Sequence, residues 1–461
     1  MFFLVLFLLI STVCSQDYYT AAVIDYSPHL ISSPSELSIT LNEFNNFCKI
    51  ASQKGAQIII FPEYGLLSQR GLNRDNILPY LEYIPDPKSS TQPIIPCGNI
   101  EFKNRTIMKT LSCIAKQNNI VVVADMGDIK PCTNSSSTND CPSDGRFQFN
   151  TLVAFSETGE LIARYHKYNL YNEHFFDPSP SVEISTFTTS FNVTFGMFIC
   201  FDIMFEHPAY DLVLQKVQNF VYSTKWVNSN YLLAVQAQQS WSGQNKVNLL
   251  ASNIGLSIKT SGSGIYSNGE ILASTFNPTF NKSSRMLISQ VPKIPKQQMT
   301  TIEMSLNIRA VVKESMIPIS AIPPHDITIV TFVPELNQKK SIQILANNNN
   351  LTCEFSYSGA RNHHFHTPTL GLLAFAGEIE GGHQVELCAV SLCNNSTKDS
   401  CLEYIFNSGI QIDSFSIKGS YKKDQHMIPI VNTSPPLKQL PKYESPSPIY
   451  SIKNLKKSFI G

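Results

Sequence analysis

The chain has 461 residues, of which 43% are hydrophobic and 15% are charged, so it can bury at least one large core and is long enough for two domains. Lys plus Arg and Asp plus Glu both number 35. This balance gives no electrostatic argument for binding to nucleic acid or to an anionic membrane surface, and we expect a small-molecule partner.

The first predicted element is an apolar stretch, Phe2 to Ile10, followed by small residues suited to cleavage after Ser15. This pattern is typical of a secretory signal peptide over residues 1–15, although no basic residue precedes it; the alternative is a short buried segment. The stretch is too short to span a bilayer as a helix, and the polar, basic residues 451–461 do not resemble the hydrophobic tail of a GPI signal. We therefore expect a soluble, secreted protein without a membrane anchor.

Acceptor sequons for N-glycosylation favour the same compartment. Several fall in Asn/Ser-rich, loop-like stretches, which is more persuasive than a single tripeptide would be. The candidate sites are Asn104, Asn134, Asn192, Asn281, Asn350, Asn394, Asn395 and Asn432.

Strands and helices alternate from residue 18 to about 290, which indicates a layered α/β domain. Residues 150–155 and 161–165 are expected to pair as a hairpin across Glu157-Thr-Gly159. The other expected strands are 19–25, 57–61, 120–124, 195–200, 220–222 and 248–251, and the expected helices are 35–52, 106–117, 208–217 and 231–241.

The pattern changes from Thr300 onward to short alternating strands, such as 327–332 and 370–375, separated by polar, turn-rich spacers. This favours a second, β-rich domain. The stretch Pro435 to Pro448 is rich in Pro, Lys and Ser, and we expect it to be an extended or mobile strap.

Secretion makes disulfides the default for the cysteines that remain after Cys14 is removed with the signal peptide. Cys132 and Cys141 flank a polar insert, Cys97 and Cys113 are close in sequence, and four more form an even set near the C-terminus. The eight disulfide candidates are Cys97, Cys113, Cys132, Cys141, Cys353, Cys388, Cys393 and Cys401.

Two cysteines remain after this count. Cys48 lies on a stripe of helical spacing with Leu41 and Phe44, which predicts a buried, inert thiol. Cys200 ends an apolar strand, where the ligand sites of open α/β folds collect. A cysteine there is a candidate nucleophile, with a core cysteine as the alternative.

Two other strands also end in reactive side chains. Pro62 closes an apolar strand, so that Glu63 follows at the edge of the sheet, and Lys167 follows the second strand of the predicted hairpin. Taken singly, each of these residues is more often an exposed polar side chain at a strand exit.

Together, Glu63, Lys167 and Cys200 follow the order of the nitrilase superfamily. Phe61-Pro-Glu63, Arg164-Tyr-His-Lys167 and Cys200-Phe-Asp202 resemble its three catalytic motifs. Further segments, among them Leu250-Ala-Ser-Asn-Ile254, resemble the vanin and biotinidase branch, and the likeness continues through the second domain.

The resemblance implies a four-layer α-β-β-α sandwich over residues 16–299 and a β-rich domain of vanin type over 300–461. It also implies an amidohydrolase that needs no cofactor and cleaves a secondary amide of pantetheine, or of biocytin and other biotinyl amides, through a cysteine thioester. A secreted binding or carrier protein that keeps the fold without turnover is the alternative.

The family's roles carry over to matching positions. Glu63 would be the general base, Lys167 the cation that stabilises the oxyanion, and Cys200 the nucleophile. Phe201 would donate its backbone N–H to the oxyanion. Glu173 matches a carboxylate that orients the lysine, although a solvated loop residue is an equal alternative.

Two further segments give weaker functional predictions. Trp226 lies where the family has a pocket wall, but an aromatic residue after a strand is more often part of a core. The run His363-His364-Phe-His366 has no carboxylate or cysteine at metal-ligand spacing beside it, so we expect an exposed loop there and no metal.

Overall fold

The computed structural model describes the chain in segments, and every structural statement below refers to these. The segments are 17–29, 33, 36–67, 71–133, 141–228, 233–256, 259–277, 283–295, 327–334, 340–346, 351–358, 361–362, 369–379, 383–402, 410–412, 414–420, 442–444 and 449–452. The predicted signal peptide, the sequons at Asn134, Asn281, Asn350 and Asn432, and His363, His364 and His366 lie outside them.

One sheet of seven strands begins the first domain. The central strands β1, β2 and β4 run parallel, β5 and β6 form the predicted hairpin, and β13 returns to pair antiparallel with β1. The strands are β1 (Tyr18–Asp25), β2 (Ile58–Ile60), β3 (Leu81–Glu82), β4 (Val121–Pro131), β5 (Arg146–Phe155), β6 (Leu161–His166) and β13 (Arg285–Pro292).

A second sheet of six strands faces the first, in the order β12-β11-β10-β9-β8-β7. Its central strands β8, β9 and β10 are parallel. The strands are β7 (Thr186–Thr188), β8 (Thr194–Ile199), β9 (Asn219–Thr224), β10 (Asn248–Asn253), β11 (Ser263–Ser267) and β12 (Glu270–Thr275). Strands β11 to β13 were not predicted from the sequence.

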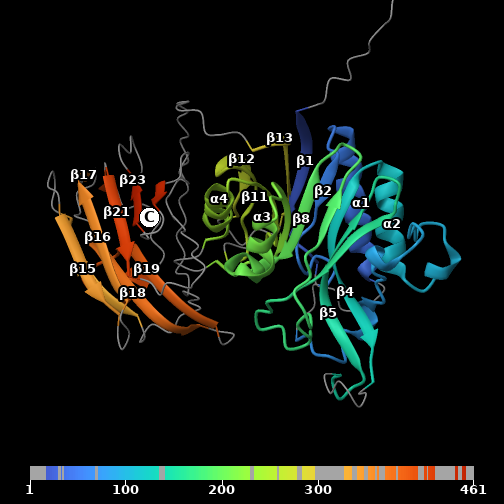
Figure 1. Ribbon diagram of the computed structural model, residues 1–461, viewed down its shortest axis with the longest axis horizontal. Helices are drawn as coiled ribbons and strands as arrows, with labels where there is room; N and C mark the ends of the chain where they lie inside the picture. Colours follow the sequence, from blue (N-terminus) through green and yellow to red (C-terminus); the bar gives the residue numbers. More distant parts are fainter. Residues whose placement is uncertain are drawn as a thin grey trace, which may run out of the picture.

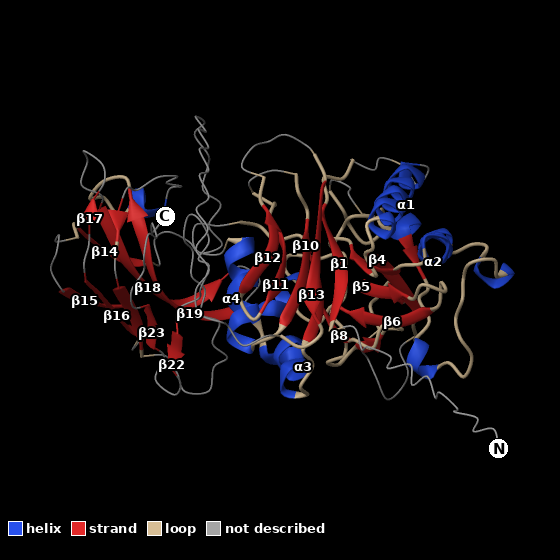
Figure 2. Ribbon diagram, turned by 90° about the horizontal axis from the view of Figure 1, so that it is seen from above, coloured by secondary structure: helices blue, strands red, loops and turns tan. Residues whose placement is uncertain are grey.

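Helices cover the outer face of each sheet, so the domain has the expected four layers (Figures 1 and 2). On the first sheet lie α1 (Leu37–Gln53) and α2 (Thr106–Asn118), and on the second lie α3 (Asp211–Leu214) and α4 (Ala234–Asn245). Trp241 of α4 packs against Phe198 and Phe220, with ring centroids 5.0 and 5.1 Å apart. None of the described helices is long and apolar enough to cross a membrane.

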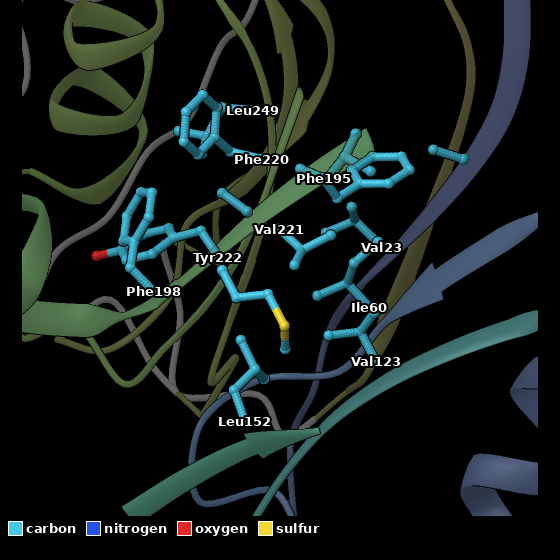
Figure 3. Close-up of a cluster of buried hydrophobic side chains, with 14 of the residues drawn as sticks. Val23, Ile60, Val123, Leu152, Phe195, Phe198, Phe220, Val221, Tyr222 and Leu249 are labelled. Atoms are coloured by element: carbon cyan, nitrogen blue, oxygen red, sulfur yellow. The ribbon is translucent and has the colours of Figure 1, made fainter. Parts of the chain in front are cut away.

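The main core lies between the two sheets. Val23, Ile60 and Val123 of the first sheet face side chains of the second, including Phe195 and Val221 (Figure 3). All five side chains are fully buried. Burial of a large apolar side chain stabilises the fold by about 1.5–3 kcal/mol, so this layer fixes the positions of the strand ends that carry the candidate site.

Short helical turns connect these elements. They span Leu78–Tyr80, Pro87–Ser89, Ile100–Phe102, Cys200–Met204, Glu206–Tyr210 and Asp399–Leu402.

The predicted helix over 208–217 was too long. The helical segment ends at Leu214, because Lys216 takes a left-handed backbone conformation with φ 67°, which ends a helix.

The second domain consists of small antiparallel sheets. One contains β14 (Thr328–Phe332), β18 (Thr369–Ile379) and β19 (His383–Cys393). Another contains β15 (Lys340–Leu345), β16 (Thr352–Ser358), β21 (Ser414–Gly419), β22 (Lys442–Glu444) and β23 (Ile449–Ile452). Strands β17 (Arg361–Asn362) and β20 (Ile410–Gln411) form a third pair.

Two expectations about this domain fall partly outside the described residues. The boundary at residue 299/300 stays a prediction, because residues 296–326 are not described. Within the predicted extended or mobile strap, Lys442–Glu444 is extended and forms a paired strand of the five-stranded sheet.

Four disulfides use all eight candidate cysteines. The pairs are Cys97–Cys113, Cys132–Cys141, Cys353–Cys388 and Cys393–Cys401. Cys48 and Cys200 are free and buried.

Candidate active site

Cys200 lies immediately after β8, at the first position of a tight helical turn. Its backbone takes φ 45°, a left-handed conformation that costs energy for a residue other than glycine and that clusters at functional sites. The hydroxyl of Tyr222, on the neighbouring strand β9, donates a 2.9 Å hydrogen bond to the Cys200 carbonyl. The turn thus holds the thiol at the carboxyl end of the sheet, with 7% of the residue exposed.

Asp202 fastens this turn to the segment that carries Lys167. One carboxylate oxygen accepts hydrogen bonds from the Ile199 N–H at 3.0 Å and from the Tyr165 hydroxyl at 2.8 Å. The other accepts two bonds from Asn169, from its backbone N–H and its side-chain amide, both at 2.9 Å. Burial raises the pKa of Asp202 to about 6 against the lowering effect of Lys167 and these donors.

Glu63 reaches the same place from the first sheet. It follows Pro62 just beyond the end of β2, and it is 1% exposed. One carboxylate oxygen accepts a hydrogen bond from the Lys167 ammonium at 2.7 Å, and the other accepts the backbone N–H of Lys225 at 2.8 Å. Both oxygens are therefore held in fixed positions.

Lys167 follows β6 and lies between two carboxylates. Its Nζ is 2.7 Å from Glu63 and 2.6 Å from Glu173, and its exposure is 2%. Burial alone would lower the Lys167 pKa, but Glu173 and Glu63 outweigh burial and raise that pKa well above its usual value. These two acceptors use two of the three N–H groups of an ammonium, which leaves the third for another acceptor.

Glu173 contacts Lys167 directly and is 6% exposed, so it is not a solvated loop residue, and its role in orienting the lysine stays a prediction. Its carboxylate also accepts hydrogen bonds from the Tyr64 hydroxyl and from the Tyr171 N–H. Burial would raise its pKa, but Lys167 and these donors lower it overall. Glu173 is therefore an anion that holds the lysine in place.

Asn150 is a site residue that sequence reasoning did not identify. Its side-chain amide donates hydrogen bonds to Glu63 at 2.8 Å and to Glu173 at 2.7 Å. Its backbone carbonyl accepts a hydrogen bond from the backbone N–H of Lys167 at 2.9 Å. The available signal was its place in the hairpin that leads to Lys167. Its bridging of two carboxylates depends on residues far apart in the chain.

The surroundings of Cys200 act on the pKa of its thiol in both directions. Burial raises its pKa above the usual range and the Glu63 carboxylate raises it further, while Lys167 and a hydrogen bond from Thr224 act in the opposite direction. A thiol with a raised pKa needs a base to become a nucleophile, and the Glu63 carboxylate is the candidate.

Two other predicted site residues are buried, whereas the described sequon residues lie at the surface. Phe201 is 8% exposed and packs in a cluster with residues of the second domain. Trp226 is 7% exposed, belongs to the core between the sheets and donates its backbone N–H to Asn253 at 2.9 Å. The described sequon residues are all exposed: Asn104, Asn192, Asn394 and Asn395.

The arrangement brings a thiol, a carboxylate and an ammonium together in a site that is nearly closed to water. A carboxylate can accept the thiol proton, and an ammonium with a remaining N–H can stabilise an oxyanion that forms beside it. The described residues therefore contain the groups needed for nucleophilic attack on a carbonyl.

Two protein families match the chain. The carbon-nitrogen hydrolase family matches residues 20–247, and the vanin C-terminal domain matches residues 322–447. The pantetheinase of Homo sapiens is 32% identical over 436 residues, which cover 90% of this chain and 82% of that protein.

Other similar proteins include biotinidases. That of Takifugu rubripes is 33% identical over 453 residues, which cover 90% of this chain and 86% of that protein. Among solved structures, an amidase of Nesterenkonia AN1 from the nitrilase superfamily covers 60% of this chain and 91% of its own, at 16% identity and a TM-score of 0.43.

Proposed function

The chain belongs to the vanin/biotinidase branch of the nitrilase superfamily of carbon-nitrogen hydrolases, and we propose that it cleaves a linear secondary amide through a thioester on Cys200. The substrate is pantetheine, which would give pantothenate and cysteamine, or a biotinyl amide such as biocytin, which would give biotin and an amine. Similarity to both a pantetheinase and a biotinidase supports these two substrate classes.

In the first half of the reaction, Glu63 takes the proton of the Cys200 thiol as the sulfur attacks the amide carbonyl. The carbonyl oxygen becomes an oxyanion, which the remaining N–H of Lys167 and the backbone N–H of Phe201 stabilise. The C–N bond then breaks, and protonated Glu63 gives its proton to the leaving amine. The acyl group stays on sulfur as a thioester.

In the second half, Glu63 takes a proton from water, and the hydroxide attacks the thioester carbonyl. The same two donors stabilise the second oxyanion. When the C–S bond breaks, the sulfur recovers its proton from Glu63 and the carboxylic acid leaves. The cycle consumes one amide and one water, and no cofactor takes part.

The observation that carries this proposal is the buried position of Lys167 between Glu63 and Glu173. Taking charges out of water costs several kcal/mol per ion, so a buried ion cluster is poor evidence for a purely stabilising role. An ammonium held this way is fixed in position and permanently charged. Those properties suit a group that stabilises developing negative charge in each turnover.

We also propose that the protein is secreted. The apolar stretch at the N-terminus, the exposed sequons and the four disulfides support this, because disulfides persist in oxidising compartments.

Hydrolysis of pantetheine and biocytin, measured side by side with the glycosylated protein, tests the proposed function. We expect turnover of at least one substrate and none above background for Cys200→Ser. Cys48→Ser is the matched control, since it changes the other free thiol, and its kcat should equal that of the wild type. Equal rates for the wild type and Cys200→Ser would contradict the proposal, and tight binding without turnover would favour a carrier.

A further inference from the structure

The turn that carries Cys200 contacts both domains. Within the first domain, Asp202 and Tyr222 hold its backbone by the hydrogen bonds described above. The side chain of Phe201, the residue after the nucleophile, belongs to a different hydrophobic cluster. The other buried members of that cluster all come from the second domain: Ile327, Ile329, Leu373, Phe375, Cys393 and Cys401.

Neighbouring side chains of the first domain widen this contact. The rings of Tyr171 and Phe205 pack edge-on against Phe201, with centroids 5.0 and 4.9 Å from it. Met204, at the end of the same turn, packs against both this cluster and the core between the sheets. Through Met204 and Phe201, the turn is held between the two domains.

On the side of the second domain, the contact is one face of the sheet β14-β18-β19. Side chains alternate between the two faces of a strand. Along β18, Leu372 and Ala374 enter the second domain's own core, whereas Leu373 and Phe375 enter the cluster with Phe201. Leu373 pairs with Ile329 on β14 and with Ala389 on β19, which places all three on this face.

The Cys393–Cys401 disulfide lies on the same face. A Cβ at Gly371 would approach the two sulfur atoms to 2.7 and 3.0 Å, so only glycine leaves them room. The face toward the first domain is therefore closely packed, and both views show the β18–β19 hairpin reaching toward that domain (Figures 1 and 2).

We propose that this face, made by Ile329, Leu373, Phe375, Leu387 and Ala389, positions the nucleophile turn, so that the second domain forms part of the amidase site. The inference rests on the proposed function. The turn contains a strained left-handed cysteine and the N–H of Phe201, and a small displacement of either moves the sulfur and the oxyanion donor relative to the substrate carbonyl. Leu373 and its neighbours are positioning residues, since they act through Phe201.

Leu372 and Leu373 provide a matched test. They are adjacent on β18 and fully buried, but only Leu373 packs in the cluster with Phe201. We expect Leu373→Ala to lower kcat about tenfold to a hundredfold with little change in KM, because displaced catalytic groups lose rate at that scale. Leu372→Ala should lose comparable thermal stability and keep kcat within about twofold per folded molecule. Leu373→Met should restore most of kcat.

The rate of Cys200 alkylation by iodoacetamide, measured by peptide mapping, depends on the position of the turn that carries Cys200 and needs no substrate. We expect a changed rate in Leu373→Ala and an unchanged rate in Leu372→Ala. If the wild type hydrolyses neither substrate, the proposed function fails, but this comparison still decides the inference. Leu387→Ala, which truncates a half-buried side chain on the same face, replaces Leu373→Ala if that variant does not fold.

Two results would overturn the inference. One is a folded Leu373→Ala protein with the kcat and the Cys200 alkylation rate of the wild type. The other is an equal loss of kcat in Leu372→Ala and Leu373→Ala, which would make the effect one of general stability.

Discussion

The surroundings of Cys48 and Cys200 show what separates a structural thiol from a candidate nucleophile. Both thiols are buried, and burial raises both pKa values above the usual range. Around Cys48, on α1, burial is the only cause, and its helix neighbours Phe44 and Ala51 are apolar. Around Cys200, Glu63 and Lys167 act on the thiol as well. Burial alone therefore gives an inert thiol. The ionisable neighbours Glu63 and Lys167 are what distinguish Cys200, the candidate nucleophile, from Cys48.

The largest difference is the ammonium beside Cys200, which Lys167→Met removes. Two buried carboxylates then lose their cation, and breaking a buried ion pair costs about 3–5 kcal/mol of stability. We expect urea unfolding at a correspondingly lower midpoint and a loss in kcat on the order of a thousandfold, the upper end of the effect of removing one oxyanion donor. Lys116→Met, which changes an exposed lysine, should alter neither quantity. Normal turnover by Lys167→Met would contradict the comparison.

The second largest difference is expected in the rates at which iodoacetamide alkylates Cys48 and Cys200. Cys48 is fully buried in the core and can react only when the protein opens, so it should label more than about a hundredfold more slowly than Cys200 in the folded protein. Cys200 labelling should increase from pH 7 to pH 9 without reaching a plateau, because its pKa is raised. Peptide mapping measures both sites, and labelling in urea is the control. Similar rates in the folded protein would show that the two environments are not distinct.

The pH dependence of kcat tests how Asp202 holds the turn that carries Cys200. With a pKa of about 6, it is protonated at lower pH, and its new hydrogen then opposes the donors that hold the turn. At pH 5 such a group is about one-tenth ionised, so we expect kcat about tenfold below its neutral plateau. In Asp202→Asn the plateau should be lower and this decline absent. A decline of identical shape in that variant would assign it to another group.

The smallest effect is expected at Lys225. Its backbone N–H, not its side chain, binds Glu63, and the contact of its ammonium within the described part of the chain is a cation–π contact with Tyr64 at 4.8 Å. Such a contact at an exposed site contributes about 0.5–1 kcal/mol, so Lys225→Met should change kcat about threefold or less. Lys225→Pro, which removes the N–H, should lower kcat about tenfold or more, since hydrogen bonds to charged groups contribute about 1.5–3 kcal/mol. A larger loss of kcat in Lys225→Met than in Lys225→Pro would show that the Lys225 side chain, not its backbone N–H, supports catalysis.

Local patterns were sufficient to predict much of the first domain. The helical stripe of α1 and the apolar runs of β2 and β8 follow from side-chain periodicity, and the cysteine count left Cys48 and Cys200 unpaired. The strand ends alone made Glu63 and Lys167 only weak candidates, and the resemblance to the nitrilase superfamily identified them; their side chains lie 2.7 Å apart.

The remaining features depend on contacts between distant segments. Asn150 bridges Glu63 and Glu173 only because the hairpin lies beside the end of β2, and no local pattern indicates this. The return of β13 to pair with β1, the early end of the helix at Leu214 and the packing of Phe201 against the second domain are likewise set by tertiary structure.

Trapping of the acyl intermediate tests the central claim most directly. The wild type would be incubated with pantetheine or biocytin and quenched in acid during steady-state turnover, and its peptides would be analysed by mass spectrometry. We predict a pantothenoyl or biotinyl group on the peptide that contains Cys200 and an unmodified Cys48. Turnover with no adduct on Cys200, or an adduct on Cys48 instead, would contradict the account.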